Sequence, residues 1–279
     1  MKLVYFRAII FCALSLLGAC TANRFYNTET PVLMDINDNN RVVVSGNIEF
    51  AGRIRRLEGQ AAVKTFGRTY LVGGAMIHQG VGDVLTAPSF FPSTAPTAEY
   101  VSRTVYGHGA LGGYFPIELT QGVSSMHFLA GVGLGSTNLR YTYNYPGAST
   151  PSPFPMPVPP VVRNYDMYWQ YNRIYLQGHY LVTGKSLRST LGMRISRFQY
   201  FNGKIDSKID EDEFIKIAKL DSESPFLLIE APWEIGYHNN RRFFVGIGVI
   251  NNIRTGGLPN MSNTMYVRTE IRLGPLLNN

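Results

Sequence analysis

Charged side chains recur at every second position in several otherwise apolar segments of this 279-residue chain. Alternate residues of a β-strand point to one face of its sheet, so these charges would share one face. Eight are basic and five are acidic, a set that can either attract anions into a channel or close on itself as buried ion pairs. The set comprises Arg41, Glu49, Glu58, Lys64, Arg173, Arg188, Arg194, Glu230, Glu234, Arg242, Arg268, Glu270 and Arg272.

The histidines are the other candidates for chemistry, and they are scattered singly along the chain. None belongs to the i, i+4 pair of a helical metal site. His78 and His108 flank the expected loop 79–99, where they could face solvent near Asp83, and this trio is the candidate for a surface hydrolase or lipid-modifying enzyme. Ten-stranded barrel proteases, the omptins, use extracellular Asp and His residues, but the chain carries no motif of that family. We therefore predict neither catalytic nor metal-binding residues.

The composition limits the class of protein. Hydrophobic residues make up 45% and aromatic residues 13%, which argues against a disordered chain. Only 16% are charged, which argues against a coiled coil or a long helical bundle. A formal net charge of +7 is modest for this length and predicts no nucleic-acid partner. Two cysteines, Cys12 and Cys20, exclude a disulfide framework and a four-cysteine zinc site.

The first residues are typical of a secretory signal, with positive charge at Lys2 and Arg7 and an apolar run over 9–17. The run is too short to cross a bilayer as a helix. The next feature, Leu17-Gly18-Ala19-Cys20, resembles the lipobox of bacterial lipoproteins. That resemblance implies cleavage of the signal peptide 1–19, a diacylglycerol on the Cys20 thiol and an acylated amine. The alternative is an ordinary signal followed by a chance cysteine.

Residues 20–40 would then form a lipid-anchored tether. Thr21, Ala22, Asn23 and Arg24 carry no acidic cluster that would suggest surface export, so we expect an anchor in the periplasmic leaflet. Apart from this covalent lipid, the sequence predicts no cofactor. The stretch 35–40 begins like a calcium loop but lacks its glycine and its bidentate glutamate, so we predict a turn there. The acidic run 206–213 has the pattern of a solvated loop more than that of a cation site.

The rest of the chain alternates with the period of β-strands, and one set of alternate positions is almost free of charge. Segments of this length suit strands that cross a bilayer at a tilt. We expect a bulge or kink at Pro232, because proline removes a ladder hydrogen bond. The predicted strands are 41–50, 57–65, 69–78, 100–114, 123–135, 167–181, 186–199, 226–237, 241–251 and 264–274.

The predicted connections alternate between short and long, which is typical of transmembrane barrels with short periplasmic turns and long extracellular loops. We therefore predict an all-β fold, an antiparallel up-and-down transmembrane barrel of about ten strands over residues 41–275. A soluble sandwich also places long loops at one end, but it does not need ten long strands. Ten strands enclose little more than their own side chains, so we expect the inward charges to pair and plug the lumen.

The lipobox, the tether ending at Asn40 and the segments 129–135 and 172–177 together resemble small lipid-anchored outer-membrane barrels of Bacteroidota. The resemblance implies a barrel in the outer membrane of a Gram-negative bacterium and no particular activity. We expect a non-enzymatic accessory, structural or surface-interaction protein. A narrow anion-preferring pore and a barrel hydrolase or lipid-modifying enzyme are the alternatives.

The expected partners are outer-membrane lipid and, through loops 79–99, 136–166 and 200–225, other outer-membrane proteins or surface glycans. The segment 146–164 is rich in proline, which favours an extended polyproline II conformation. Tyrosines and Trp169 flank it on both sides. A stiff loop with aromatic flanks suits partner contact, and the same aromatics suit an interfacial belt.

Overall fold

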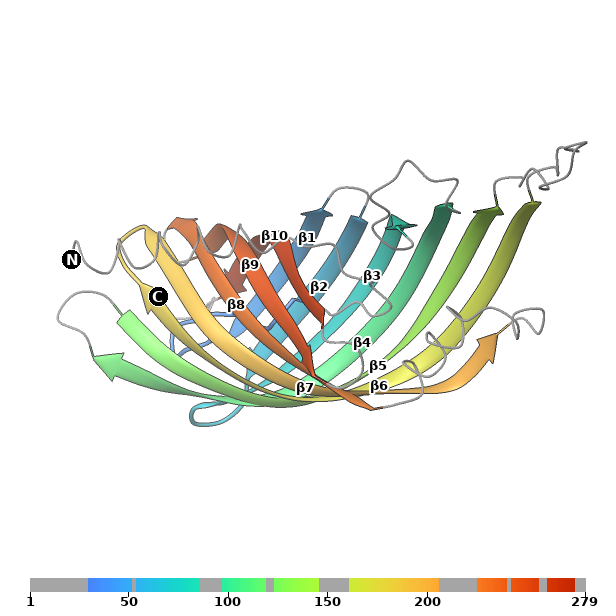
Figure 1. The fold of residues 1–279 in the computed structure, drawn as a ribbon. Helices are drawn as coiled ribbons and strands as arrows, with labels where there is room; N and C mark the ends of the chain where they lie inside the picture. The colour runs from blue at the N-terminus through green and yellow to red at the C-terminus, as the bar shows by residue number, and fades with distance from the viewer. Residues whose placement is uncertain are drawn as a thin grey trace, which may run out of the picture.

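The computed structural model describes residues 30–51, 54–85, 97–118, 123–145, 161–205, 225–239, 242–255 and 260–273. Within them ten antiparallel strands close into one barrel, each strand pairing with the next along the chain and β1 pairing with β10 (Figure 1). In this part of the chain, no helix is long and apolar enough to cross a membrane. The strands are β1 (Val42–Ala51), β2 (Ile54–Lys64), β3 (Thr69–Leu85), β4 (Thr97–Glu118), β5 (Val123–Tyr145), β6 (Val161–Thr183), β7 (Leu187–Ile205), β8 (Phe226–Asn239), β9 (Phe243–Thr255) and β10 (Asn260–Leu273).

The predicted all-β, up-and-down barrel of ten strands is confirmed. We call the end with the connections 65–68, 119–122, 184–186 and 240–242 the short-turn end, and the opposite end the long-loop end. Because the number of strands is even, β1 begins and β10 finishes at the short-turn end.

The predicted lengths of the three long loops are wrong. Loops 79–99, 136–166 and 200–225 shrink to 86–96, 146–160 and 206–225, because β3 to β7 extend well past their predicted ends. In the extension of β5 the described outward positions are polar, as at Asn138 and Arg140, and Arg140 is joined by a 2.7 Å ion pair to Asp166, which lies opposite it on β6. The apolar alternation that marks a strand in the sequence is therefore lost while the backbone ladder continues.

The outward face of the barrel is apolar and the inward face is polar. On β2, Leu57 and Val63 are exposed, whereas Glu58 and Gln60 are buried. The other strands alternate in the same way, which confirms the neutral face predicted from the sequence. A closed sheet leaves no unpaired backbone edge, and an apolar exterior around a polar interior is what a bilayer requires. The chain therefore has the fold of an outer-membrane β-barrel.

Polar residues mark where the apolar exterior ends towards the long loops. Gln79, Arg103 and Asn138 lie opposite one another on β3, β4 and β5, and all three are exposed. Gln79 also pairs with Arg55, next to the first residue of β2. The wall made by β1 and β2 therefore ends near this boundary, while β3 to β7 rise beyond it (Figure 1).

The sequence predicts a bulge or a kink at Pro232, and the register shows no bulge. The register between β7 and β8 is the same on both sides of the proline, with Leu191 opposite Trp233 and Arg194 opposite Glu230. The backbone ladder lacks only the pairs between these two, and Pro232 itself stays in register with Ile250 of β9. The missing N–H of Pro232 therefore removes backbone pairing only locally, and the register of β8 is unchanged.

Inward-facing glycines of β5 make room for tyrosine rings of the neighbouring strands β4 and β6. A Cβ atom added to Gly133 would lie 1.9 Å from the Tyr106 hydroxyl oxygen, and one added to Gly131 would lie 2.3 Å from the Tyr175 ring. Both tyrosines are buried. Tyr106 is further stacked on Tyr171, with ring centroids 5.7 Å apart, so its ring has little freedom to move.

We expect Gly133→Ala to destabilise the barrel by about 1–3 kcal/mol, because the new methyl group overpacks the Tyr106 ring. Gly109→Ala is the matched control, since its Cβ would point outward and lie 3.8 Å from the nearest atom. Denaturant unfolding of the refolded barrel in detergent measures both variants. Equal effects of the two substitutions would contradict the overpacking, and adding Tyr106→Leu should relieve the loss in Gly133→Ala.

Candidate functional site

The lumen is the candidate site, and part of the chain itself occupies it. Residues 30–36 are buried, as is Asn40, although they precede the first strand. Val32, Met34 and Ile36 pack in one cluster with side chains of the barrel wall. The second half of the predicted tether 20–40 therefore lies inside the barrel, and we call residues 30–40 the lumen segment.

At the short-turn end the lumen segment is held by a turn and an ion pair. The Asn37 side-chain oxygen accepts hydrogen bonds from the backbone N–H groups of Asn39 (2.9 Å) and Asn40 (3.0 Å), which is the turn predicted for this stretch. Asp38 pairs with Lys64 and accepts a 2.8 Å hydrogen bond from the Tyr114 hydroxyl. The hydrogen bonds from Lys64 and Tyr114 hold the pKa of Asp38 below its usual value.

Deeper in the lumen, wall side chains satisfy the backbone of the segment. The Gln177 amide bonds both to the N–H (3.2 Å) and to the carbonyl of Val32. Arg268 donates to the Pro31 carbonyl at 2.8 Å, and the Thr30 N–H donates to Glu58 at 2.7 Å. Buried backbone groups need such partners, so these contacts allow a segment without regular secondary structure to lie inside the barrel.

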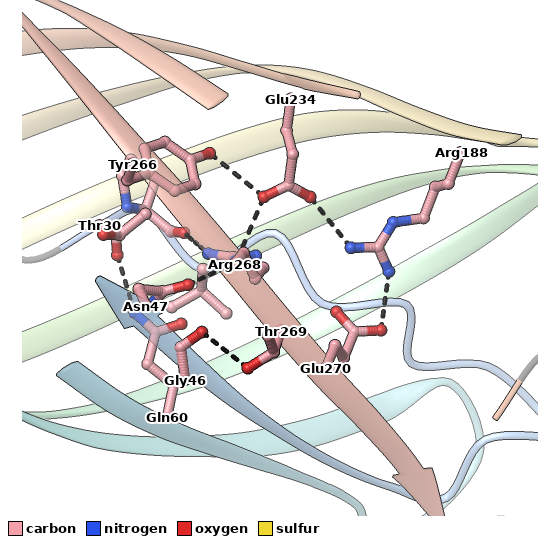
Figure 2. Close-up of polar contacts among 12 residues, drawn as sticks. Thr30, Gly46, Asn47, Gln60, Arg188, Glu234, Tyr266, Arg268, Thr269 and Glu270 are labelled. Carbon is pink, nitrogen blue, oxygen red and sulfur yellow. Dashed lines mark hydrogen bonds and ion pairs between the residues drawn. The ribbon is translucent and has the colours of Figure 1, made fainter. Parts of the chain in front are cut away.

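Arg188 is the centre of the main ion-pair network (Figure 2). Its two terminal nitrogens contact Glu234 at 3.0 Å and Glu270 at 2.7 Å. Arg268 lies 3.3 Å from Glu234, and Arg272 lies 2.8 Å from Glu270. The network is therefore a chain of alternating charges contributed by β7, β8 and β10.

The lumen segment joins this network through Asp35, which lies 3.1 Å from Arg272. The guanidinium of Arg188 also lies over the Phe244 ring, 3.5 Å from its centroid. A cation that has been taken out of water gains from such a ring face as well as from its carboxylates. The network thus links the wall, the aromatic lining and the segment.

A second charged cluster lies on β6, β7 and β8. Arg173 and Arg194 both contact the Glu230 carboxylate, at 2.5 Å each. Ser196 accepts a hydrogen bond from Arg173 at 2.6 Å. On the other side of the barrel, Arg56 pairs with Glu49 at 3.2 Å. All of these side chains are almost fully buried.

The buried charges balance, and the excess of basic charge predicted for the lumen is wrong. Arg41 and Arg242 are exposed at the short-turn end, outside the lumen, and Lys64 is half-buried at its mouth. Arg242 belongs to the turn before β9, where the strand alternation has not yet begun. Among the described residues, six arginines and six carboxylates are buried: Arg56, Arg173, Arg188, Arg194, Arg268, Arg272, Asp35, Glu49, Glu58, Glu230, Glu234 and Glu270.

The histidines do not form the surface site considered from the sequence. His78 and His108 are buried on the inward face, so the expectation that they face solvent is wrong. The side chain of Asp83 lies outside the described residues. His127 and His179 stack with their centroids 4.5 Å apart, and Ser125 lies 2.8 Å from His127 Nε2. In the described ranges, no three His, Cys, Asp or Glu residues are grouped so that they could hold a metal ion.

Several residues of the site were missed from the sequence. Arg56 precedes the predicted start of its strand at 57, and Asp35 was assigned to a turn leading into the first strand. Gln60 and Gln177 carry no charge, yet they bind the backbone of the lumen segment. The inward alternation of β2 and β6 contains all three wall positions, so a search over every polar inward residue would have found them.

No protein-family model matches the chain, and no curated protein matches it. Among solved structures, it is similar to the outer membrane protease OmpT from Escherichia coli, with 10% identity, 84% of this chain and 94% of that chain covered, and a TM-score of 0.43. It is also similar to LpxR from Salmonella typhimurium, with 8% identity, 83% and 99% covered, and a TM-score of 0.35. Likenesses this distant carry no argument about activity.

Proposed function

We propose that this protein is a non-enzymatic, lipid-anchored β-barrel of the outer membrane of a Gram-negative bacterium, in which the chain's own N-terminal segment plugs the lumen. The observation that carries the proposal is the filled, charge-balanced interior. The lumen segment is buried against the wall, and every buried arginine contacts a carboxylate or belongs to a network that contains one. A balanced interior of this kind gives no net attraction for anions, which argues against the pore alternative.

The lipid part of the proposal rests on Leu17-Gly18-Ala19-Cys20 and on the resemblance to lipid-anchored barrels of Bacteroidota. A diacylglycerol and an N-acyl chain on Cys20 would be the only groups attached to the protein. Two or more acyl chains give stable membrane anchoring. Globomycin, which blocks the lipoprotein signal peptidase, should then cause a larger precursor to accumulate; an unchanged size would remove the lipid anchor from the proposal.

A plugged barrel leaves its long loops as the surface available for function, so we propose an accessory or surface-interaction role. Outer-membrane proteins and surface glycans are the expected partners. The proline-rich connection 146–160 joins β5 and β6, which rise furthest beyond the apolar boundary. A proline-rich loop carried by two such strands is suited to partner contact, because it loses little conformational entropy when it binds.

We expect replacement of residues 147–160 by two glycines to abolish co-purification of partners from native membranes while the barrel stays folded. Tyr145 and Val161 lie opposite each other, and Pro146 with the two glycines is long enough to connect them, so the strand ladder is retained. Affinity purification followed by mass spectrometry measures the partners, and the heat-dependent gel shift of the folded barrel is the control. Unchanged co-purification from a folded variant would contradict a role for this loop.

A further inference from the structure

The lumen segment runs along the barrel axis in one direction, and this direction indicates at which end of the barrel the residues before Thr30 leave. At its C-terminal end, Asp38 contacts Lys64, the last residue of β2 at the short-turn end. At its N-terminal end, Thr30 contacts Glu58 and Arg56, six and eight residues further along β2 towards the long-loop end. Followed backwards from β1, the lumen segment therefore runs from the short-turn end towards the long-loop end.

Contacts on β10, which flanks β1 on the side away from β2, follow the same order. On β10, Asp35 contacts Arg272, and Pro31 contacts Arg268, which is four residues closer to the long-loop end. Asn47, which lies opposite both Arg268 and Glu58, places these contacts at one level of the wall. Figure 2 shows Thr30, Asn47 and Arg268 together at this level. The contacts on β2 and those on β10 thus give the same direction.

We infer that the chain threads the barrel from end to end, so that the residues before Thr30 leave at the long-loop end and Cys20 lies on the same face of the membrane as the long loops. With those loops outside the cell, any lipid on Cys20 anchors the protein in the outer leaflet. This conclusion rests on the barrel orientation and on the lipid anchor of the proposed function. It replaces the periplasmic anchor expected from the sequence.

The distances allow this path. Thr30 is level with Arg56 to Gln60, and β2 begins at Ile54, so only a few residues of β2 lie between Thr30 and the long-loop end of that strand. This end of β2, which forms the rim of the barrel here, lies near the polar boundary marked by Gln79 and Arg103. Nine residues separate Cys20 from Thr30, and an extended chain spans about 3.3 Å per residue, or about 30 Å here. The lipid can therefore cross the rim and enter the adjacent leaflet.

A return to the short-turn end is sterically blocked. The chain would have to pass beside residues 30–36, which are themselves buried against the wall. The same level of the lumen holds Glu234 and the three side chains that contact it, Arg188, Arg268 and Tyr266, all of them buried. A close-packed interior has no space for a second pass of backbone.

Thiol labelling on intact cells tests the threading. Cys12 leaves with the signal peptide and Cys20 is acylated in the proposed protein, so one introduced cysteine is the only free thiol. Three variants are compared: Asn23→Cys before the lumen segment, Arg68→Cys in the exposed turn after β2, and Ser152→Cys in the proline-rich loop. A membrane-impermeant maleimide is applied before and after permeabilisation of the outer membrane, with the wild type as the blank.

We expect Asn23→Cys to be labelled on intact cells to the same extent as Ser152→Cys, and Arg68→Cys to be labelled only after permeabilisation. Labelling of Asn23→Cys only after permeabilisation, together with surface labelling of Ser152→Cys, would overturn the threading. Labelling of the wild type would show a free Cys20 and so contradict the lipid anchor. Surface labelling of Arg68→Cys with protection of Ser152→Cys would instead contradict the barrel orientation.

Discussion

Replacing residues 30–36 by a glycine–serine linker of equal length should convert a non-conducting barrel into one that passes ions. In the wild type these residues fill the lumen with Val32, Met34 and Ile36 and satisfy Gln177, Arg268 and Arg272 on the wall. A linker whose side chains are only hydrogen atoms and hydroxymethyl groups leaves most of this volume to water. The turn at 37–40 and its contact with Lys64 are retained, so the linker keeps the same entry point.

Planar lipid bilayers with the purified proteins measure the effect. We expect no stable single-channel steps from the wild type and discrete steps from the variant. Removal of Asp35 leaves Arg272 with one carboxylate fewer, so the open lumen should weakly prefer anions. The same linker placed within 146–160 is the matched control and should leave the barrel closed. Stable anion-selective steps from the wild type would instead establish the pore alternative, and a folded but silent variant would show that the wall alone closes the lumen.

The same variant should also lose stability. Burial of a large apolar side chain contributes about 1.5–3 kcal/mol, and four such side chains are removed: Val32, Leu33, Met34 and Ile36. This loss of stability affects how the conductance is interpreted, because a partly unfolded barrel could leak. The folded state of the variant is therefore checked by its gel shift before the bilayer measurement.

Arg188→Met should be the most destabilising single substitution in the wall of the lumen. It leaves Glu234 and Glu270 buried with one cation fewer, and it removes a cation from the Phe244 ring. Removal of one partner from a buried ion pair costs about 3–5 kcal/mol, because the remaining charge stays desolvated. Methionine keeps most of the side-chain volume, so the loss of stability reflects the lost charge more than lost packing.

Denaturant unfolding in detergent measures the loss, and two further variants sharpen it. Arg242→Met makes the same chemical change at the exposed turn and should alter stability by less than about 0.5 kcal/mol. Adding Glu234→Gln to Arg188→Met restores the charge balance and should recover part of the stability, since Arg268 keeps its bonds to Asn47 and Pro31. Equal stability of Arg188→Met and the wild type would show that the network is dispensable.

Most of the wall could be predicted from the sequence, because the two-residue period of a strand is a local property. Val44, Ile48, Leu57 and Val63 were assigned to the outer face, and they are exposed there. The ends of β3 to β7 could not be predicted in this way. Their outward residues face water above the membrane, so nothing in the side-chain pattern separates them from a loop, and only the neighbouring strand shows that they are paired.

The candidate site could likewise be predicted only in part. Alternation alone placed Arg188, Glu234 and Arg268 on the inner face, where they are buried. It could not show which carboxylate each arginine contacts, because β7, β8 and β10 come together only when the sheet closes. Arg242 was assigned inward by extending the alternation one residue past the strand, into a turn where it no longer applies.

The sequence by itself determined the barrel, its strand order and its two faces, since each of these depends on neighbouring residues, while the lipid on Cys20 stays a prediction. Only the tertiary structure decided that residues 30–36 lie inside the barrel and that the buried charges balance. Thr30 and Glu58, or Val32 and Gln177, are distant along the chain and share no pattern. They are brought into contact by the closed wall, whose narrow interior makes an unpaired charge or backbone group costly.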